Sequence, residues 1–157
     1  MDIEIVMENG GVIKAELYPA SAPITVANFL KLIDENFYDG LIFHRVISGF
    51  MIQGGGMDKD MTPKHAESIK GEFARNGVDN PLKHTRGVLS MARTMFPNSA
   101  SSQFFIMHAD APHLDGEYAA FGKVTEGMEI VDAIAETATD MSDCPITPQI
   151  IKTIKRV

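Results

Sequence analysis

The chain has 157 residues, 45% of them hydrophobic and 22% charged, and its formal net charge is −7. This length and composition are typical of one globular domain with a hydrophobic core. The negative charge argues against general nucleic-acid binding, which needs a basic surface, and no apolar run is long enough to cross a membrane.

The cysteine content and the start of the chain bear on the cellular compartment. Cys144 is the single cysteine, which excludes an internal disulfide and fits a reducing environment. The start, Met1-Asp2-Ile3-Glu4, is acidic and lacks the basic and then apolar order of a signal peptide. We therefore expect a cytoplasmic protein.

A hairpin and a helix are predicted first. Residues Asp2 to Pro19 contain two strand-like runs that flank Asn9-Gly10, a dipeptide typical of tight hairpin turns. A helix is expected from about Pro23 to Glu35, with Ser21 or Ala22 at its cap and a proline in its first turn. Its apolar stripe has helical spacing and consists of Val26, Phe29, Leu30 and Ile33.

The stretch Phe43 to Gly56 carries one arginine and one glutamine in an otherwise apolar run. It predicts two strands joined by a tight turn at Ser48-Gly49. Strand alternation would place Phe43, Arg45 and Ile47 on one face, and Met51 with Gln53 on one face of the second strand. Because an unpaired buried guanidinium is costly, we expect this face to be the wall of a groove with an apolar floor and a wet rim. Gly54 to Gly56 should end the strand, where the backbone turns sharply or another segment comes close.

Loops and short strands alternate in the rest of the chain. Residues 57–81 are expected to form a long surface loop around one short strand, with Asn76-Gly77 as a turn. Thr125 is expected to cap a second helix, with Glu126 and Glu129 near its positive end. Further strands are predicted over 87–92, 103–107, 118–124 and 150–154. This pattern favours a mainly β fold, a closed or nearly closed antiparallel barrel with helices over its ends, in one domain over 1–157.

Several kinds of site lack support in the sequence. The five histidines are scattered without the spacing of metal ligands. His44 is expected to be a hydrogen-bonded core residue, and His113 either lines a pocket or lies on the surface. No Gly-x-Ser-x-Gly motif is present, and Gly54 to Gly56 do not open a helix as a phosphate cradle would. We therefore expect no metal and no cofactor.

The remaining candidate site is a groove. Ten methionines are many for this length, and Met51, Met91, Met95 and Met107 either form an adaptable binding surface or fill the core. A groove with an arginine, a glutamine and large apolar groups suits an apolar side chain whose backbone is held by hydrogen bonds. It could catalyse only a reaction that breaks no covalent bond.

The segment Phe43 to Gly55 resembles the signature of the cyclophilins, the cyclosporin-binding class of peptidyl-prolyl cis-trans isomerases. Further similar blocks follow in the same order: Leu82 to Thr85 running into Gly87 to Ala92, Ser102 to Ile106, and Leu114 to Gly116 with Phe121 to Val124. The opening hairpin and first helix also fit, so the resemblance covers nearly the whole chain. The short form of the chain, without a signal peptide, is similar to the bacterial cytoplasmic members of the family. It implies an eight-stranded antiparallel β-barrel capped by two α-helices, and an isomerase that accelerates rotation about X-Pro bonds and assists protein folding.

The resemblance also implies roles for single residues. Arg45 would stabilise the twisted prolyl amide, and Gln53 would join it in catalysis. The substrate-binding residues that it implies are Phe50, Met51, Ala92, Arg93, Thr94, Gln103, Phe105, His113, Leu114 and Tyr118. The implied partners are proline-containing peptides and unfolded proteins, with no nucleic acid and no membrane, and the chain is expected to be a monomer.

Three positions depart from the best-known eukaryotic pattern of this family. His113 stands where those members have tryptophan, Arg93 where they have asparagine, and Tyr118 where they have histidine. The asparagine contacts peptide mainly through its backbone, so Arg93 can keep that role. Loss of the indole implies that cyclosporin binds only weakly, while isomerisation is expected to persist.

Two other interpretations remain open. In the first, the chain is a module that binds proline peptides or unfolded chains, and its catalysis is incidental. In the second, it is a structural barrel in which Arg45 forms a fixed ion pair. Glu67, Glu72 and Asp79 are the available acidic partners. The presence of Arg45 together with Gln53 counts against binding alone, which would not need that arginine.

Overall fold

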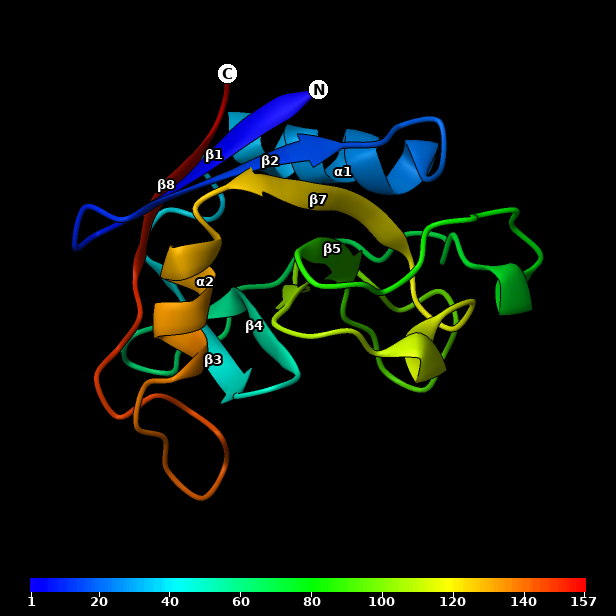
Figure 1. The fold of residues 1–157 in the computed structure, drawn as a ribbon. Helices are drawn as coiled ribbons and strands as arrows, with labels where there is room; N and C mark the ends of the chain where they lie inside the picture. The colour runs from blue at the N-terminus through cyan, green and yellow to red at the C-terminus, as the bar shows by residue number, and fades with distance from the viewer.

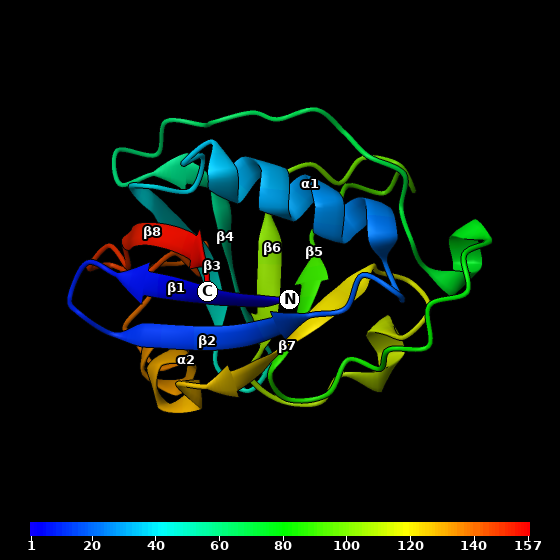
Figure 2. The same cartoon turned by 90° about the horizontal axis from the view of Figure 1, so that it is seen from above.

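Eight antiparallel strands form one sheet that curls into a nearly closed barrel (Figures 1 and 2). The computed structural model describes all residues, 1–157. The strands are β1 (Asp2–Met7), β2 (Val12–Leu17), β3 (Leu41–Ile47), β4 (Met51–Asp58), β5 (Val88–Met91), β6 (Phe104–Met107), β7 (Ala120–Glu126) and β8 (Ile151–Arg156). Their order in the sheet is β3-β4-β6-β5-β7-β2-β1-β8, so the predicted mainly β fold is confirmed.

The two edge strands of this sheet, β3 and β8, approach each other and nearly close it. The Phe43 N–H donates to the Gln149 carbonyl at 3.0 Å, and the Gly40 N–H donates to the Ile151 carbonyl at 2.8 Å. Ile150, the residue just before β8, also forms an antiparallel β-bridge with Ile42 of β3. For part of its length β3 therefore has backbone partners on both sides, which covers an edge that could pair with another chain.

Two helices cover the barrel, α1 (Pro23–Asp34) and α2 (Met128–Ala135), on opposite sides of β1 and β2 in Figure 2. The predicted apolar stripe of α1 is buried and consists of Val26, Phe29, Leu30 and Ile33. The Phe29 ring packs against three other aromatic rings at centroid distances of 5.2, 5.3 and 5.0 Å: Tyr38, Phe104 and Phe121. These rings belong to a core of 32 buried residues, whose removal from water is the main force that drives folding.

The predicted cap of the second helix is wrong. Thr125 lies in β7, which continues to Glu126 because Glu126 pairs with Lys14 of β2. The helix begins after Gly127, whose φ of +92° is a left-handed conformation that favours glycine. Glu129 does lie in the first turn of α2, as expected.

One extra residue in β3 decides which side chains reach the barrel core. Phe43 pairs with Gly54 and Arg45 pairs with Gln53, so His44 is the extra residue of a β-bulge. Because neighbouring residues of β4 point to opposite faces, Phe43 lies fully buried in the core while Arg45 lies exposed on the outer face. The prediction that Phe43 shares a face with Arg45 is therefore wrong.

The bulge also determines the surroundings of the His44 side chain and of Gly54. The Nδ1 atom of half-buried His44 has no hydrogen-bond partner, so the expected hydrogen-bonded core histidine is wrong. Burial and the charge of Arg45 both lower the pKa of His44. Gly54 lies opposite the bulge, where an added Cβ would come within 2.6 Å of the Ile42 carbonyl oxygen. The close approach predicted for the glycines is thus present, although β4 continues through them to Asp58.

Beyond the end of β4 at Asp58, the segment 57–81 contains no strand, so the prediction of a separate short strand in this loop is wrong. It holds one 3-10 helix, Ala74–Asn76, followed by Gly77 at φ +82° in the predicted turn. The segment is attached to the domain by side chains, because Glu72 and Phe73 are only 2% exposed. Glu72 Oε1 accepts hydrogen bonds from the Thr25 N–H at 2.6 Å and from the Thr25 hydroxyl at 2.8 Å. Since the N-cap residue of α1 supplies no side-chain acceptor, Glu72 caps this helix from a distant part of the chain.

We expect Glu72→Ala to lower the free energy of unfolding by about 2–3 kcal/mol, because it leaves buried donors at the start of α1 without an acceptor. Urea unfolding followed by circular dichroism measures this change. The control is Glu67→Ala, which removes an exposed carboxylate from the same segment and should change the free energy by less than about 0.5 kcal/mol. Equal unfolding midpoints for Glu72→Ala and the wild type would contradict the capping role.

Candidate active site

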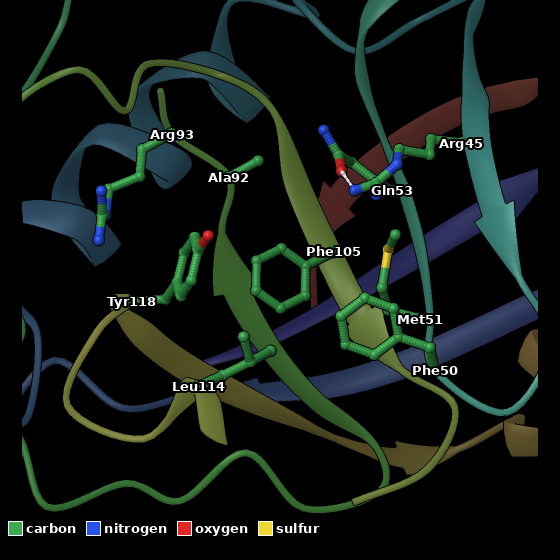
Figure 3. A pocket seen from close by; sticks show the side chains of 9 residues that line it. All are labelled: Arg45, Phe50, Met51, Gln53, Ala92, Arg93, Phe105, Leu114 and Tyr118. Carbon is green, nitrogen blue, oxygen red and sulfur yellow. Dashed lines mark hydrogen bonds between the residues drawn. The ribbon is translucent and has the colours of Figure 1, made fainter. Parts of the chain in front are cut away.

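A cavity of about 150 Å³ opens on the outer face of the barrel beside the β3–β4 hairpin (Figure 3). Nine residues line it: Arg45, Phe50, Met51, Gln53, Ala92, Arg93, Phe105, Leu114 and Tyr118. They come from β3, β4 and the turn between them, from β6, from the residues after β5, and from the segment around the 3-10 helix Pro112–Leu114. The fold therefore brings together nine of the residues that the sequence predicted for the site.

The apolar floor of this cavity belongs to a second hydrophobic cluster, separate from the barrel core. Its seven buried residues are Met51, Val88, Phe105, Met107, Ala111, Leu114 and Ala120. Strand register creates this cluster: Met51 pairs with Met107, and Gln53 pairs with Phe105, on the outer face. The residues between them, Ile52 and Ile106, point into the barrel core instead.

The four methionines named from the sequence divide among three environments. Met51 lies in the floor of the cavity, Met107 lies in the same hydrophobic cluster without lining the cavity, and Met91 belongs to the barrel core. Met95 is 86% exposed. The four therefore do not form one surface.

Polar side chains follow one another along the other wall of the cavity. Arg45 Nη1 lies 3.4 Å from Gln53 Oε1 (Figure 3), and Gln53 Nε2 donates to Gln103 Oε1 at 3.0 Å. Arg45 is exposed and takes part in none of the ion pairs of the structure. Its guanidinium therefore keeps free N–H donors at the rim, and the interpretation of Arg45 as part of a fixed ion pair is wrong.

At the opposite end of the cavity, contacts of the guanidinium group fix the position of Arg93. Its guanidinium lies 4.7 Å from the ring centres of both Phe73 and Tyr118. Its Nε and Nη2 atoms donate to the Glu117 carbonyl at 3.1 and 2.6 Å. The Tyr118 ring in turn packs edge-on against Phe105 at 5.7 Å. Arg93 thus joins the segment 57–81 to the wall of the cavity.

The other three predicted site residues lie just outside this cavity. Thr94 and Gln103 line an adjoining cavity of about 240 Å³. The two cavities share the residues Gln53, Ala92 and Arg93. His113 is exposed, and its ring stacks on Phe50 at a centroid distance of 6.0 Å. His113 therefore lies at the surface and supports the cavity wall from outside.

His84 supports the floor from behind, and no pattern in the sequence indicated this role. Its side chain is fully buried, with Nδ1 3.1 Å from Asp115 Oδ1 and Nε2 2.8 Å from Ser90 Oγ. Its ring stacks on Phe105 at 6.1 Å. Burial lowers the pKa of His84, although the hydrogen bond and charge of Asp115 act in the opposite direction. A buried, mainly neutral imidazole therefore holds Phe105 in place.

His108 anchors the tip of the β3–β4 hairpin, another role that the sequence analysis missed. The backbone N–H of Gly49 donates to His108 Nδ1 at 2.8 Å, and the backbone N–H of His108 donates to the Phe50 carbonyl at 2.9 Å. His108 Nε2 lies 3.1 Å from Asp132 Oδ1 in α2, so Nε2 carries the proton when Nδ1 accepts. Arg86 donates to both oxygens of Asp132 and thereby lowers the pKa of that carboxyl. Residues distant in sequence therefore fix the position of Phe50.

The fold and the site together define a β-barrel protein with an outward-facing cavity that has an apolar floor. Comparison with known proteins identifies its family: the model of the cyclophilin-type peptidyl-prolyl cis-trans isomerases matches residues 2–156. The chain therefore belongs to the cyclophilin family of peptidyl-prolyl cis-trans isomerases, and the expected resemblance is confirmed.

Individual relatives agree with this assignment. The chain is 52% identical over 137 residues to a peptidyl-prolyl cis-trans isomerase of Acinetobacter baylyi, which covers 83% of this chain and 70% of that protein. It is 43% identical over 158 residues to peptidyl-prolyl cis-trans isomerase B of Escherichia coli, covering 93% and 94% of the two chains. A crystal structure of a Cryptosporidium parvum cyclophilin in the presence of the dipeptide Ala-Pro superposes with a TM-score of 0.87. It is 36% identical and covers 100% of this chain and 99% of that one.

The helices of the structure bear on membrane association. Neither α1 nor α2 combines the length and the apolar character that a bilayer-spanning helix needs.

We expect the free energy of unfolding to fall as the pH drops below about 6.5, the ordinary histidine pKa. The pKa values of His84 and His44 are lowered in the folded chain, mainly by burial. Well above this pH both residues are neutral in the folded and unfolded states. Below it the unfolded chain binds protons that the folded chain does not, so the folded state loses stability.

Urea unfolding between about pH 8 and about pH 5.5 measures this dependence, with at most about 1.4 kcal/mol per pH unit from each histidine. His84→Gln should show a shallower decline than the wild type, because only His44 then contributes a lowered pKa. A wild-type free energy that stays constant over this range would contradict the assignment.

We expect His108→Leu to raise the KM for a proline-containing peptide about threefold to tenfold with little change in kcat, because Phe50 loses its anchor while Arg45 stays in place. His108→Asn should restore most of the wild-type KM, since its amide oxygen can accept from the Gly49 N–H in place of Nδ1. Steady-state isomerase kinetics measures both parameters. If the leucine and asparagine variants behave alike, the hydrogen bond to Gly49 does not position Phe50.

Proposed function

We propose that the cavity binds the proline ring of an X-Pro segment and that Arg45 accelerates rotation about the X-Pro bond, which would assist the folding of proline-containing proteins. The observation that carries this proposal is an arginine without an ionic partner at the rim of an apolar cavity. The Cryptosporidium parvum relative was crystallised in the presence of Ala-Pro, a dipeptide that contains such a bond. Proline-containing peptides are therefore the proposed substrates of this chain.

The reaction breaks no covalent bond, which suits a site without a nucleophile. Rotation about a peptide bond is slow because nitrogen shares its lone pair with the carbonyl, which creates a barrier of roughly 18–20 kcal/mol. X-Pro bonds populate both isomers, and their uncatalysed exchange takes about tens to hundreds of seconds. An enzyme can therefore act by stabilising the twisted bond alone.

Arg45 is suited to recognise that twisted bond. When the bond rotates, the proline nitrogen regains its lone pair and becomes a hydrogen-bond acceptor, which it is not in the planar state. A guanidinium N–H that donates to this nitrogen would stabilise the transition state more than the ground state, which is the condition for catalysis. The long contact of 3.4 Å with Gln53 orients Arg45 without using up its donors.

The residues around Arg45, in this cavity and in the adjoining one, bind and position the substrate. Met51, Phe105 and Leu114 are 2%, 5% and 8% exposed and form an apolar surface for the proline ring. Gln53 and Gln103, joined by their own hydrogen bond, hold the substrate backbone beside it. Burial of the ring at the apolar floor would fix the proline while the preceding carbonyl rotates.

We propose that cyclosporin binds this chain only weakly, because His113 stands in place of a tryptophan. The imidazole stacks on Phe50 at the surface and offers a smaller apolar face than the indole of the eukaryotic pattern. This difference lies outside the residues that line the cavity, so it leaves the proposed isomerisation in place.

A binding module without catalysis is the alternative function. A binder would need only the apolar floor and the two glutamines, whereas the free guanidinium of Arg45 would add a desolvation cost on binding. The exposed, unpaired state of Arg45 therefore favours the isomerase.

We expect Arg45→Ala to lower kcat/KM for an Ala-Pro peptide by about 10²–10³, the usual loss when one transition-state hydrogen bond is removed. The affinity for the same peptide should change by less than about threefold, because the interaction is weak in the planar ground state. Exchange spectroscopy measures the rate and a titration measures the affinity. Arg45→Lys, which keeps the charge but not the planar fork of donors, should recover only part of the rate.

Equal losses of rate and affinity in Arg45→Ala would contradict the proposed role of this residue. A protease-coupled assay of wild type separates the alternatives, because a binding module should not accelerate the exchange. The same assay with cyclosporin should show inhibition only at high concentrations of the drug.

A further inference from the structure

The turn between Arg93 and Ser99 exposes the large apolar side chains of two consecutive residues. Met95 is 86% exposed and Phe96 is 69% exposed. Single exposed apolar residues are common on proteins. These two are adjacent in sequence, and their turn borders the second cavity, which Thr94 and Ser99 line.

Hydrogen bonds hold this turn in a fixed shape. The Thr94 N–H donates to Ser99 Oγ at 2.9 Å, and the Thr94 hydroxyl lies 2.8 Å from the same oxygen. Ser99 Oγ donates to the Phe96 carbonyl at 2.7 Å, and the Phe96 N–H lies 3.3 Å from Thr94 Oγ1. The backbone of Phe96 is therefore tied to the two side chains that line the second cavity.

The segment 71–76 supports the other side of the turn. Asn98 Oδ1 accepts from the Gly71 N–H at 3.1 Å and from Asn76 Nδ2 at 2.9 Å. The Pro97 carbonyl oxygen occupies the place that a Cβ on Gly71 would take, at 2.2 Å. Because hydrogen bonds fix this turn from both sides, its backbone needs little further ordering when a ligand contacts the exposed side chains of Met95 and Phe96.

A long substrate that leaves the first cavity can follow the second one to this turn. The two cavities adjoin, since Gln53, Ala92 and Arg93 line both. The first cavity has a volume of about 150 Å³, so a longer extended chain must continue beyond it along the surface. Unfolded polypeptides expose apolar side chains, which a flexible methionine and an aromatic ring can both contact.

We infer that Met95 and Phe96 form a contact site for apolar side chains of unfolded polypeptides whose X-Pro bond lies in the first cavity. The inference rests on the proposed function and extends it from the proline ring to the residues around it. The contact selects long, apolar, unfolded chains over short peptides. It therefore affects how tightly the substrate binds and leaves the rotation step unchanged.

The test compares Met95→Ser/Phe96→Ser with wild type on three substrates. These are the short peptide Ala-Ala-Pro-Phe, a longer peptide with leucine and phenylalanine on both sides of the same Ala-Pro bond, and that longer peptide with serine at those positions. The control variant is Met141→Ser/Ile146→Ser, which removes a matched exposed pair, 104% and 67% exposed, that lines neither cavity. Unfolding midpoints of all variants should match, since every replaced side chain is exposed.

We expect the Met95→Ser/Phe96→Ser variant to raise KM for the apolar long peptide about tenfold, with kcat unchanged and with KM values for the other two peptides within about twofold of wild type. The control variant should match wild type on all three. The inference is overturned if the KM for the apolar long peptide does not change or if the control variant raises it equally. It is also overturned if wild type is a dimer in gel filtration that Met95→Ser/Phe96→Ser converts to a monomer, since the pair then contacts a second copy.

These outcomes separate the inference from the proposed function. If wild type does not accelerate exchange in Ala-Ala-Pro-Phe, the proposed function fails. If wild type accelerates that exchange but the variants do not differ on the apolar long peptide, only the contact site fails.

Discussion

The bulge at His44 is the constraint on which the site depends. One extra residue in β3 lets Phe43 fill the barrel core while Arg45, two positions later, reaches the outer face. Without the bulge, strand alternation would send both side chains to the same face, and either the core would lose an aromatic ring or a guanidinium would be buried at a high cost. Gly54 makes the bulge possible, because a side chain there would collide with the backbone of β3.

The strands β4 and β6 then serve two hydrophobic clusters at once. Their inward residues, such as Ile52 and Ile106, complete the barrel core, and their outward residues, Met51 and Phe105, form the floor of the cavity. A rigid barrel therefore fixes the positions of the site residues, which is what selective stabilisation of a transition state requires. Buried polar contacts add to this rigidity, above all His84 behind Phe105.

Local patterns in the sequence predicted most of the fold because hairpins, amphipathic helices and strands depend on nearby residues. The Asn9-Gly10 hairpin, the apolar stripe of α1 and the strand pair around Ser48-Gly49 illustrate this. The bulge was missed because nothing within β3 shows which of its residues lacks a partner in β4. The roles of Glu72 and His108 were missed because each acts on a residue far away in the chain, Thr25 and Gly49 respectively. The resemblance to cyclophilins named the residues that line the cavity, but only the fold shows that Arg45 lacks an ionic partner.

The central claim is that the outer face of β3, β4 and β6 binds the proline of an X-Pro bond and accelerates its rotation. Nuclear magnetic resonance with methyl-labelled methionine tests it in one sample that contains wild-type protein and an Ala-Pro peptide. We predict faster cis-trans exchange of the peptide together with a shift of the Met51 methyl signal, which lies in the floor, and no shift of Met91, which lies in the barrel core. Exchange at the uncatalysed rate, or acceleration without a response at Met51, would contradict the account.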